Sequence, residues 1–116
     1  MKDVLVIENN QMIAELTARM INSSQKYQIH SRVAYNLTNG LKQIQEKAPD
    51  VVILDCHLND RSQSTQEAIA IVNQLKMLDR QVPVILFTGS GSKLRVIELM
   101  QLGAIDCVSK NSDSFL

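Results

Sequence analysis

The stretch Val51-Val52-Ile53-Leu54-Asp55 is an unbroken apolar run that stops at a carboxylate. Four consecutive aliphatic residues without polar alternation are typical of a strand buried on both faces, as in a parallel sheet. Two runs of the same kind lie on either side of it in the sequence, at Val4 to Ile7 and, after a proline, at Val84 to Phe87. The three runs predict the central strands of one parallel sheet.

Amphipathic segments alternate with these strands. Apolar residues at helical spacing predict helices over residues 11–22 and 36–47, around Ala68 to Leu75, and around Leu94 to Met100 with Gly103 as its cap. Two weaker strands are expected at about 27–34, as an edge strand, and at 105–108. Strict alternation of strand and helix predicts an α/β domain whose parallel sheet carries helices on both faces. The methionines fall on apolar helix faces, so we expect them to fill the core.

Length and composition restrict the function. The chain has 116 residues, which fits a single domain over 1–116. Twelve basic and twelve acidic residues balance, so direct nucleic-acid binding is not expected. Cys56 and Cys107 lack metal-site spacing and are expected to be reduced, buried thiols. The apolar run after Met1-Lys2-Asp3 is too short for a signal peptide or a membrane span, which predicts a cytoplasmic protein without membrane contact.

Reactive side chains follow four of the five strands: Glu8, Asp55, Thr88 and Lys110. Ligands of open parallel sheets bind at the carboxyl ends of the strands, so we expect these side chains to converge there. Together they suit a phosphoryl-handling site, in which Asp55 is the nucleophile and Thr88 and Lys110 bind the phosphoryl oxygens. Glu8 and Asn9 would help to hold Mg²⁺, which prefers oxygen ligands.

Four segments carry a resemblance to the receiver domain of two-component response regulators: 4–10, 49–55, 83–89 and 103–110. The intervals also agree with that family, at 47 positions from Glu8 to Asp55 (55 minus 8), 33 to Thr88 (88 minus 55) and 22 to Lys110 (110 minus 88). The resemblance implies a flavodoxin-like, three-layer, doubly wound fold with strand order 2-1-3-4-5. It also implies that a histidine kinase or phosphotransfer protein phosphorylates Asp55. The domain would then change the surface around its fourth helix and fifth strand, toward an output domain or protein, acting as a switch and not as an enzyme.

The sequence departs from the receiver pattern in several places. Asn9 replaces the second member of the family's acidic pair, so Mg²⁺ binding should be weaker. Cys107 replaces the switch aromatic, and Asn59 and Asn111 replace two family prolines. The resemblance also assigns a metal ligand to the backbone carbonyl of His57. The chain ends before the family's fifth helix could form, which would leave apolar sheet surface uncovered and predicts a homodimer through that region.

Other hypotheses stay open at this stage. Asn9 and Cys107 favour a pseudo-receiver, which would keep the fold and a protein-binding face but signal without phosphorylation. A phosphatase of the haloacid dehalogenase type would need a second Asp where His57 stands, and a flavodoxin-like cofactor carrier would suffer repulsion between Glu8 and a flavin phosphate. The residues Glu8 and Asn9 could instead form a helix-capping turn. The His57 side chain could be a metal ligand or an acid catalyst.

Overall fold

A five-stranded, fully parallel sheet in the order β2-β1-β3-β4-β5 forms the centre of the molecule. The computed structural model describes residues 2–55, 66–78, 81–88 and 93–109. The strands are β1 (Lys2–Ile7), β2 (Ile29–Ala34), β3 (Val51–Asp55), β4 (Val84–Thr88) and β5 (Asp106–Ser109). The helices in this part of the chain are α1 (Gln11–Asn22), α2 (Leu37–Glu46), α3 (Gln66–Lys76) and α4 (Lys93–Leu102). The predicted fold class and strand order are confirmed.

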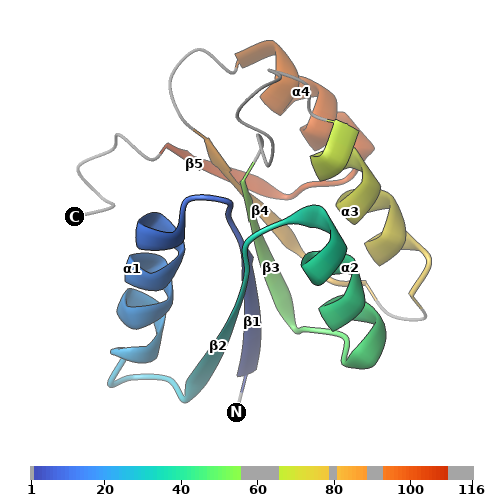
Figure 1. The fold of residues 1–116 in the computed structure, drawn as a ribbon. Coiled ribbons are helices and arrows are strands. Elements are labelled where there is room, and N and C mark those ends of the chain that lie inside the picture. Colours follow the sequence, from blue (N-terminus) through green and yellow to red (C-terminus); the bar gives the residue numbers. More distant parts are fainter. Residues whose placement is uncertain (1, 56–65, 79–80, 89–92, 110–116) are drawn as a thin grey trace.

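The two faces of the sheet are covered unequally. One face carries α1, which packs on β2 and β1, and the other carries α2, α3 and α4, as Figure 1 shows. The main hydrophobic cluster lies on the three-helix side, because it contains Leu5 and Ile7 of β1 and Val52 and Leu54 of β3 but not the alternate residues of these strands. The core is therefore built mainly on one side of the sheet.

Helix ends lie close to where the sequence predicted them. Asn10 and Asn36 are the N-caps of α1 and α2, and each side-chain oxygen accepts a hydrogen bond from the backbone N–H three residues later, at 3.1 and 2.8 Å. Gly103 follows α4 with a φ of +131°, and the N–H of Ala104 donates to the carbonyl of Leu99 at 3.1 Å. The predicted glycine cap is confirmed. None of the helices in the described ranges is both long and apolar enough to span a membrane.

Two expectations about apolar residues were wrong. The edge strand begins at Ile29 and not near Tyr27, because the N–H of Tyr27 donates to the hydroxyl of Ser24 in the preceding turn, at 3.3 Å. The methionines of the described residues do not fill the core: Met12 is 78% exposed and Met77 79%. The sequence shows which helix positions are apolar, but not whether the sheet beneath extends far enough to cover all of them.

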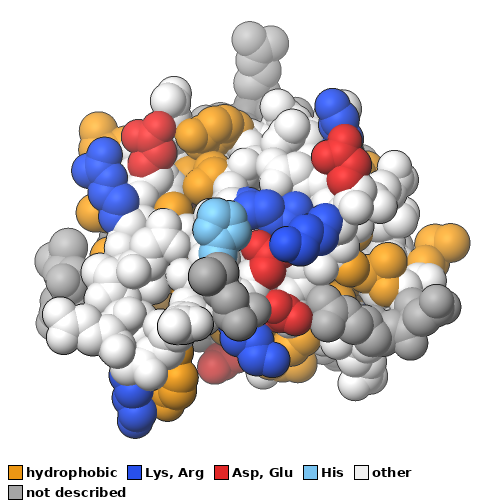
Figure 2. All heavy atoms as spheres, turned by 90° about the horizontal axis from the view of Figure 1, so that it is seen from below, with side chains coloured by type: hydrophobic (Ala, Val, Ile, Leu, Met, Phe, Trp, Pro, Cys, Tyr) orange, Lys and Arg blue, Asp and Glu red, His pale blue; other side chains and the backbone are white. Residues whose placement is uncertain are grey.

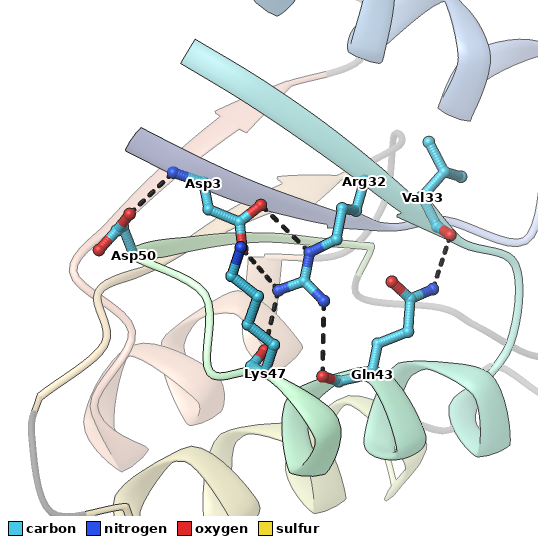
Figure 3. A network of polar contacts seen from close by, with 6 residues as sticks. All are labelled: Asp3, Arg32, Val33, Gln43, Lys47 and Asp50. Atoms are coloured by element: carbon cyan, nitrogen blue, oxygen red, sulfur yellow. Dashed lines mark hydrogen bonds and ion pairs between the residues drawn. The ribbon is translucent and has the colours of Figure 1, made fainter. Parts of the chain in front are cut away.

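A polar network closes the amino-terminal end of the sheet. Seen from that end, basic side chains and a histidine surround acidic ones, as Figure 2 shows. Figure 3 shows Arg32 of β2 donating from Nε and Nη2 to both carboxylate oxygens of buried Asp3 in β1, at 3.1 and 2.7 Å. The same guanidinium donates to the carbonyls of Gln43 and Lys47 at the end of α2, at 3.5 and 2.9 Å. One side chain thus joins two strands to the end of α2, where the Gln43 carbonyl also accepts the N–H of the C-cap residue Lys47 at 3.0 Å.

Candidate functional site

The candidate site lies at the carboxyl edge of the sheet, opposite the polar network. All strands are parallel, so their carboxyl ends meet at the edge that is uppermost in Figure 1. Ile7 of β1 is the register partner of Leu54 in β3, so Glu8 and Asp55, one residue further along each strand, lie at neighbouring positions. Asp55 in turn is paired with Phe87 of β4, one residue before Thr88. Three of the four predicted strand-end residues therefore stand on adjacent strands at one edge.

Asp55 is the last residue of β3 and is only 2% exposed. Strand β3 is central in the sheet, with β1 on one side and β4 on the other. The ladders on both sides fix its backbone, so the carboxylate stands on a rigid element. A buried carboxylate on a central strand is held where a reacting group can meet it, and water has little access to compete.

Glu8 is 1% exposed and lies in the turn between β1 and α1. Its backbone N–H donates to the carbonyl of Ala34 at the end of β2, at 3.0 Å, which fixes the turn to the sheet. One carboxylate oxygen accepts a hydrogen bond from the N–H of Asn10 at 3.4 Å. Two buried carboxyl groups thus stand at neighbouring positions of this edge.

The neighbouring asparagines have different roles. Asn10 caps α1, one residue after the pair Glu8 and Asn9 for which the sequence left a capping turn open; an asparagine directly before an amphipathic helix is the usual signal. Capping by Asn10 means that the half-buried Asn9 is not needed for it. The structure thus gives the capping function to the residue after Asn9.

The remaining predicted site residues are only partly described. Thr88 ends β4 and pairs with Ser109 of β5, so its backbone position at the edge is established. Ser109 directly precedes Lys110, which lies outside the described residues together with His57 and Asn59. Cys107 of β5 is half buried and packs against the main hydrophobic cluster, so it does not project from the surface as a reactive thiol would.

The donor set fits Mg²⁺. Glu8 and Asp55 offer buried carboxylate oxygens, the ligand type that Mg²⁺ prefers. In residues 2–55, 66–78, 81–88 and 93–109 there is no group of three or more His, Cys, Asp or Glu side chains that could hold a metal. An ion here would take its other ligands from the amide oxygen of Asn9, from backbone carbonyls and from water, as Mg²⁺ commonly does.

Comparison with known sequences identifies a family. The family model described as the response regulator receiver domain matches residues 4–114. An NtrX-like response regulator of Rickettsia typhi is 28% identical over 116 residues, which are 98% of this chain and 23% of that protein. The C4-dicarboxylate response regulator DctR of Bacillus subtilis is 27% identical over 107 residues, 92% of this chain and 45% of the relative. The chain thus spans about a quarter of the NtrX-like relatives and under half of DctR.

Solved structures show the same fold. NtrX of Brucella abortus superposes with a TM-score of 0.83 at 24% identity, covering 98% of this chain and 25% of that one. A response regulator receiver domain protein of Clostridium thermocellum superposes with a TM-score of 0.76 at 24% identity, covering 98% and 86%. At these identities the agreement concerns the fold, and the assignment to a family depends on the sequence match over residues 4–114.

Proposed function

Because the chain belongs to the response regulator receiver domain family, we propose that it is a phosphoacceptor module in which Asp55 receives a phosphoryl group from a histidine kinase or phosphotransfer protein. The observation that carries this proposal is the pair of buried carboxylates, Glu8 and Asp55, at neighbouring strand ends. A rigid sheet edge holds the nucleophile and a metal-binding carboxylate in fixed positions, which phosphoryl transfer requires.

The chemistry follows from the side chains. A carboxylate oxygen of Asp55 forms the new oxygen–phosphorus bond while the phosphorus–nitrogen bond of the donor histidine breaks, and the released imidazole takes up a proton. Glu8, Asn9, Asp55 and the backbone carbonyl of His57 would hold Mg²⁺. When bound, the ion neutralises charge on the phosphoryl oxygens. In this proposal the hydroxyl of Thr88 and the ammonium group of Lys110 bind those oxygens and couple phosphorylation to the following loops.

The signal would leave through α4 and β5. Ile97 and Met100 of α4 are 53% and 37% exposed, and Ile105, just before β5, is 61% exposed. Exposed apolar side chains on α4 and just before β5 favour a protein partner. We therefore assign this region to the contact with an output domain or protein, and the chain's role is that of a switch and not of an enzyme.

Mass spectrometry of the intact protein tests the proposal. After treatment with acetyl phosphate and Mg²⁺, the wild-type chain should gain one phosphoryl group and Asp55→Asn should gain none. Asp106→Asn is the matched control, because Asp106 is an exposed aspartate at the start of β5 and should not affect phosphorylation. Equal phosphorylation of wild type and Asp55→Asn would overturn the assignment.

A pseudo-receiver is the second candidate. Two observations favour it: Asn9 brings an amide and not a charge to the acidic pair, and Cys107 packs against the core at the position of the family's switch aromatic. A phosphorylation-independent module would show no response to Mg²⁺ and beryllium fluoride at millimolar concentration. Amide chemical shifts near Glu8 and Asp55 that move with both ions would exclude it.

A further inference from the structure

Strand β2 lies at one edge of the sheet, so one side of its backbone has no strand beside it in the described part of the chain (Figure 1). Its other side is bonded to β1. The N–H of Lys2 donates to the carbonyl of Gln28, and the N–H of Glu8 donates to the carbonyl of Ala34, both at 3.0 Å. Because alternate residues of a strand turn their backbone groups to opposite sides, the even-numbered residues face β1. The groups that face outward belong to Ile29, Ser31 and Val33.

An open strand edge can pair with another chain, and proteins usually guard it with a proline, a bulge or a charged side chain. Strand β2 contains no proline, and its register with β1 is continuous from Ile29 to Ala34. The charge of its arginine, Arg32, is neutralised by the ion pair with Asp3. Protection of this edge therefore has to come from groups outside the strand.

Two helix side chains bind outward backbone groups of β2, one from each face of the sheet. The side-chain oxygen of Asn22, the last residue of α1, accepts hydrogen bonds from the N–H and the hydroxyl of Ser31, at 3.1 and 3.0 Å. Gln43 of α2 donates from Nε2 to the carbonyl of Val33 at 2.9 Å, as Figure 3 shows. The same nitrogen donates to the side chain of Asn39 at 2.7 Å, which helps to hold Gln43 in this position.

We propose that Asn22 and Gln43 close this edge of the sheet to pairing with β2 of a second copy of the chain. Two identical strands can pair antiparallel around a two-fold axis at Ser31. That arrangement uses the N–H and the carbonyl of Ser31 in both copies, and it bonds Ile29 of each copy to Val33 of the other. The N–H of Ser31 and the carbonyl of Val33 are already occupied, so only the bond from the Val33 N–H to the Ile29 carbonyl stays possible.

A purely structural role makes a different prediction. The hydrogen bonds of Asn22 and Gln43 also attach α1 and α2 to the sheet, so their loss lowers the free energy of unfolding in either case. Only protection of the edge predicts that the folded variant pairs with itself. Association of the folded protein is therefore the decisive measurement.

Sedimentation velocity between about 10 µM and about 1 mM measures that association. The double variant Asn22→Ala with Gln43→Ala keeps both helices, since alanine favours them. Its dimer association constant should exceed that of the wild type at least about tenfold, because the bonds blocked by the two side chains become available in both copies.

The matched control is Asn73→Ala with Gln101→Ala. It removes the same two side-chain types from exposed positions of α3 and α4, and it should sediment like the wild type. Gln43→Ala alone frees the Val33 carbonyl and should show a smaller rise, which gives a second test if the double variant does not fold. Equal association of the two double variants would refute the proposal.

Amide hydrogen exchange locates the contact. In the wild type, the outward amide of Ser31 should exchange more slowly than that of Val33, because Asn22 accepts its hydrogen. Asn22→Ala should speed this exchange about fivefold or more, whereas Asn22→Asp, which keeps an acceptor oxygen, should not.

Concentration dependence of exchange in the double variant completes the test. Its Val33 amide should become protected as concentration rises, since that N–H bonds to Ile29 of the second copy in the paired state. Association without this protection would place the contact elsewhere and overturn the proposal. None of these measurements requires phosphorylation of Asp55, so the outcome is independent of the proposed phosphoacceptor function.

Discussion

Arg32 and Asp3 form a two-point ion pair between adjacent strands: Nε and Nη2 of the guanidinium donate to the two carboxylate oxygens at 3.1 and 2.7 Å. Their side chains are 18% and 9% exposed, so water screens the pair poorly. The backbone N–H of Asp3 also donates to the carboxylate of Asp50 at 2.8 Å. The network joins β1, β2 and the turn before β3, and it fixes these three segments at the end of the sheet away from the candidate site.

Loss of Arg32 should destabilise the fold strongly. Arg32→Ala leaves the buried carboxylate of Asp3 without its cation and should lower the free energy of unfolding by about 3 kcal/mol. Lys42→Ala is the control, because the Lys42–Glu46 pair is 4.0 Å long and highly exposed, and its loss should cost about 0.5 kcal/mol or less. Urea denaturation measures both. Equal midpoints for the two variants would contradict the role given to Arg32.

Restoring a carboxylate at residue 9 should strengthen Mg²⁺ binding. Asn9→Asp adds a charged ligand beside Glu8 and Asp55 and should tighten binding by about tenfold. Asn10→Asp adds the same charge one residue away, where Asp replaces Asn well as an N-cap of α1. Calorimetric titration compares the two variants. If both tighten binding equally, the gain comes from net charge and residue 9 is not a ligand.

Tyr35 should ionise later than a free tyrosine. Desolvation, followed by the charge of Glu15 and the hydrogen bond to it, raises the pKa of Tyr35 above 10.0. Because the folded-state pKa is raised, the stability contributed by the protonated phenol is present below pH 10.0 and is lost as pH rises through the folded-state pKa. Glu15→Gln should lower that pKa. Tyrosinate absorbance in a Tyr27→Phe background measures it, and an unchanged titration would contradict the assignment.

Gly103 should not tolerate a side chain. Its φ of +131° is a conformation that L residues rarely adopt, so Gly103→Ala should cost about 1–3 kcal/mol of unfolding free energy. Gly40→Ala is the control. Gly40 is inside α2, where alanine favours the helix by about 1 kcal/mol and its Cβ would meet the flexible ends of Ile7 and Ile71 at 3.1 and 3.3 Å. Thermal unfolding should show the larger loss at Gly103.

The sheet could be predicted because its signals are local. Unbroken apolar runs marked β1, β3 and β4, and an asparagine or a glycine marked the helix ends. The position of Asp55 beside Glu8 also followed, since parallel strands bring their carboxyl ends together. The roles of Asp55, Thr88, Lys110 and the metal ligands remain predictions.

Long-range features could not be predicted in the same way. Arg32 and Asp3 are 29 positions apart, and nothing local links a charged residue in one strand to another in the next. The only available sign was an acidic residue at the start of a strand that is otherwise apolar. The exposure of Met12 and Leu16 was missed because helical periodicity shows an apolar stripe but not what lies opposite to it.

The placement of the core on the three-helix side also determines how the molecule opens. Helix α1 can lift away from β1 and β2 without disturbing the main hydrophobic cluster, to which it contributes no residue. Undocking of this helix would leave that cluster intact, so its amides should exchange with solvent before those of β3 and β4. A molecule opened in this way exposes Val4 and Val6 of β1 to solvent. The additional exposed apolar surface makes this opened state a natural starting point for aggregation.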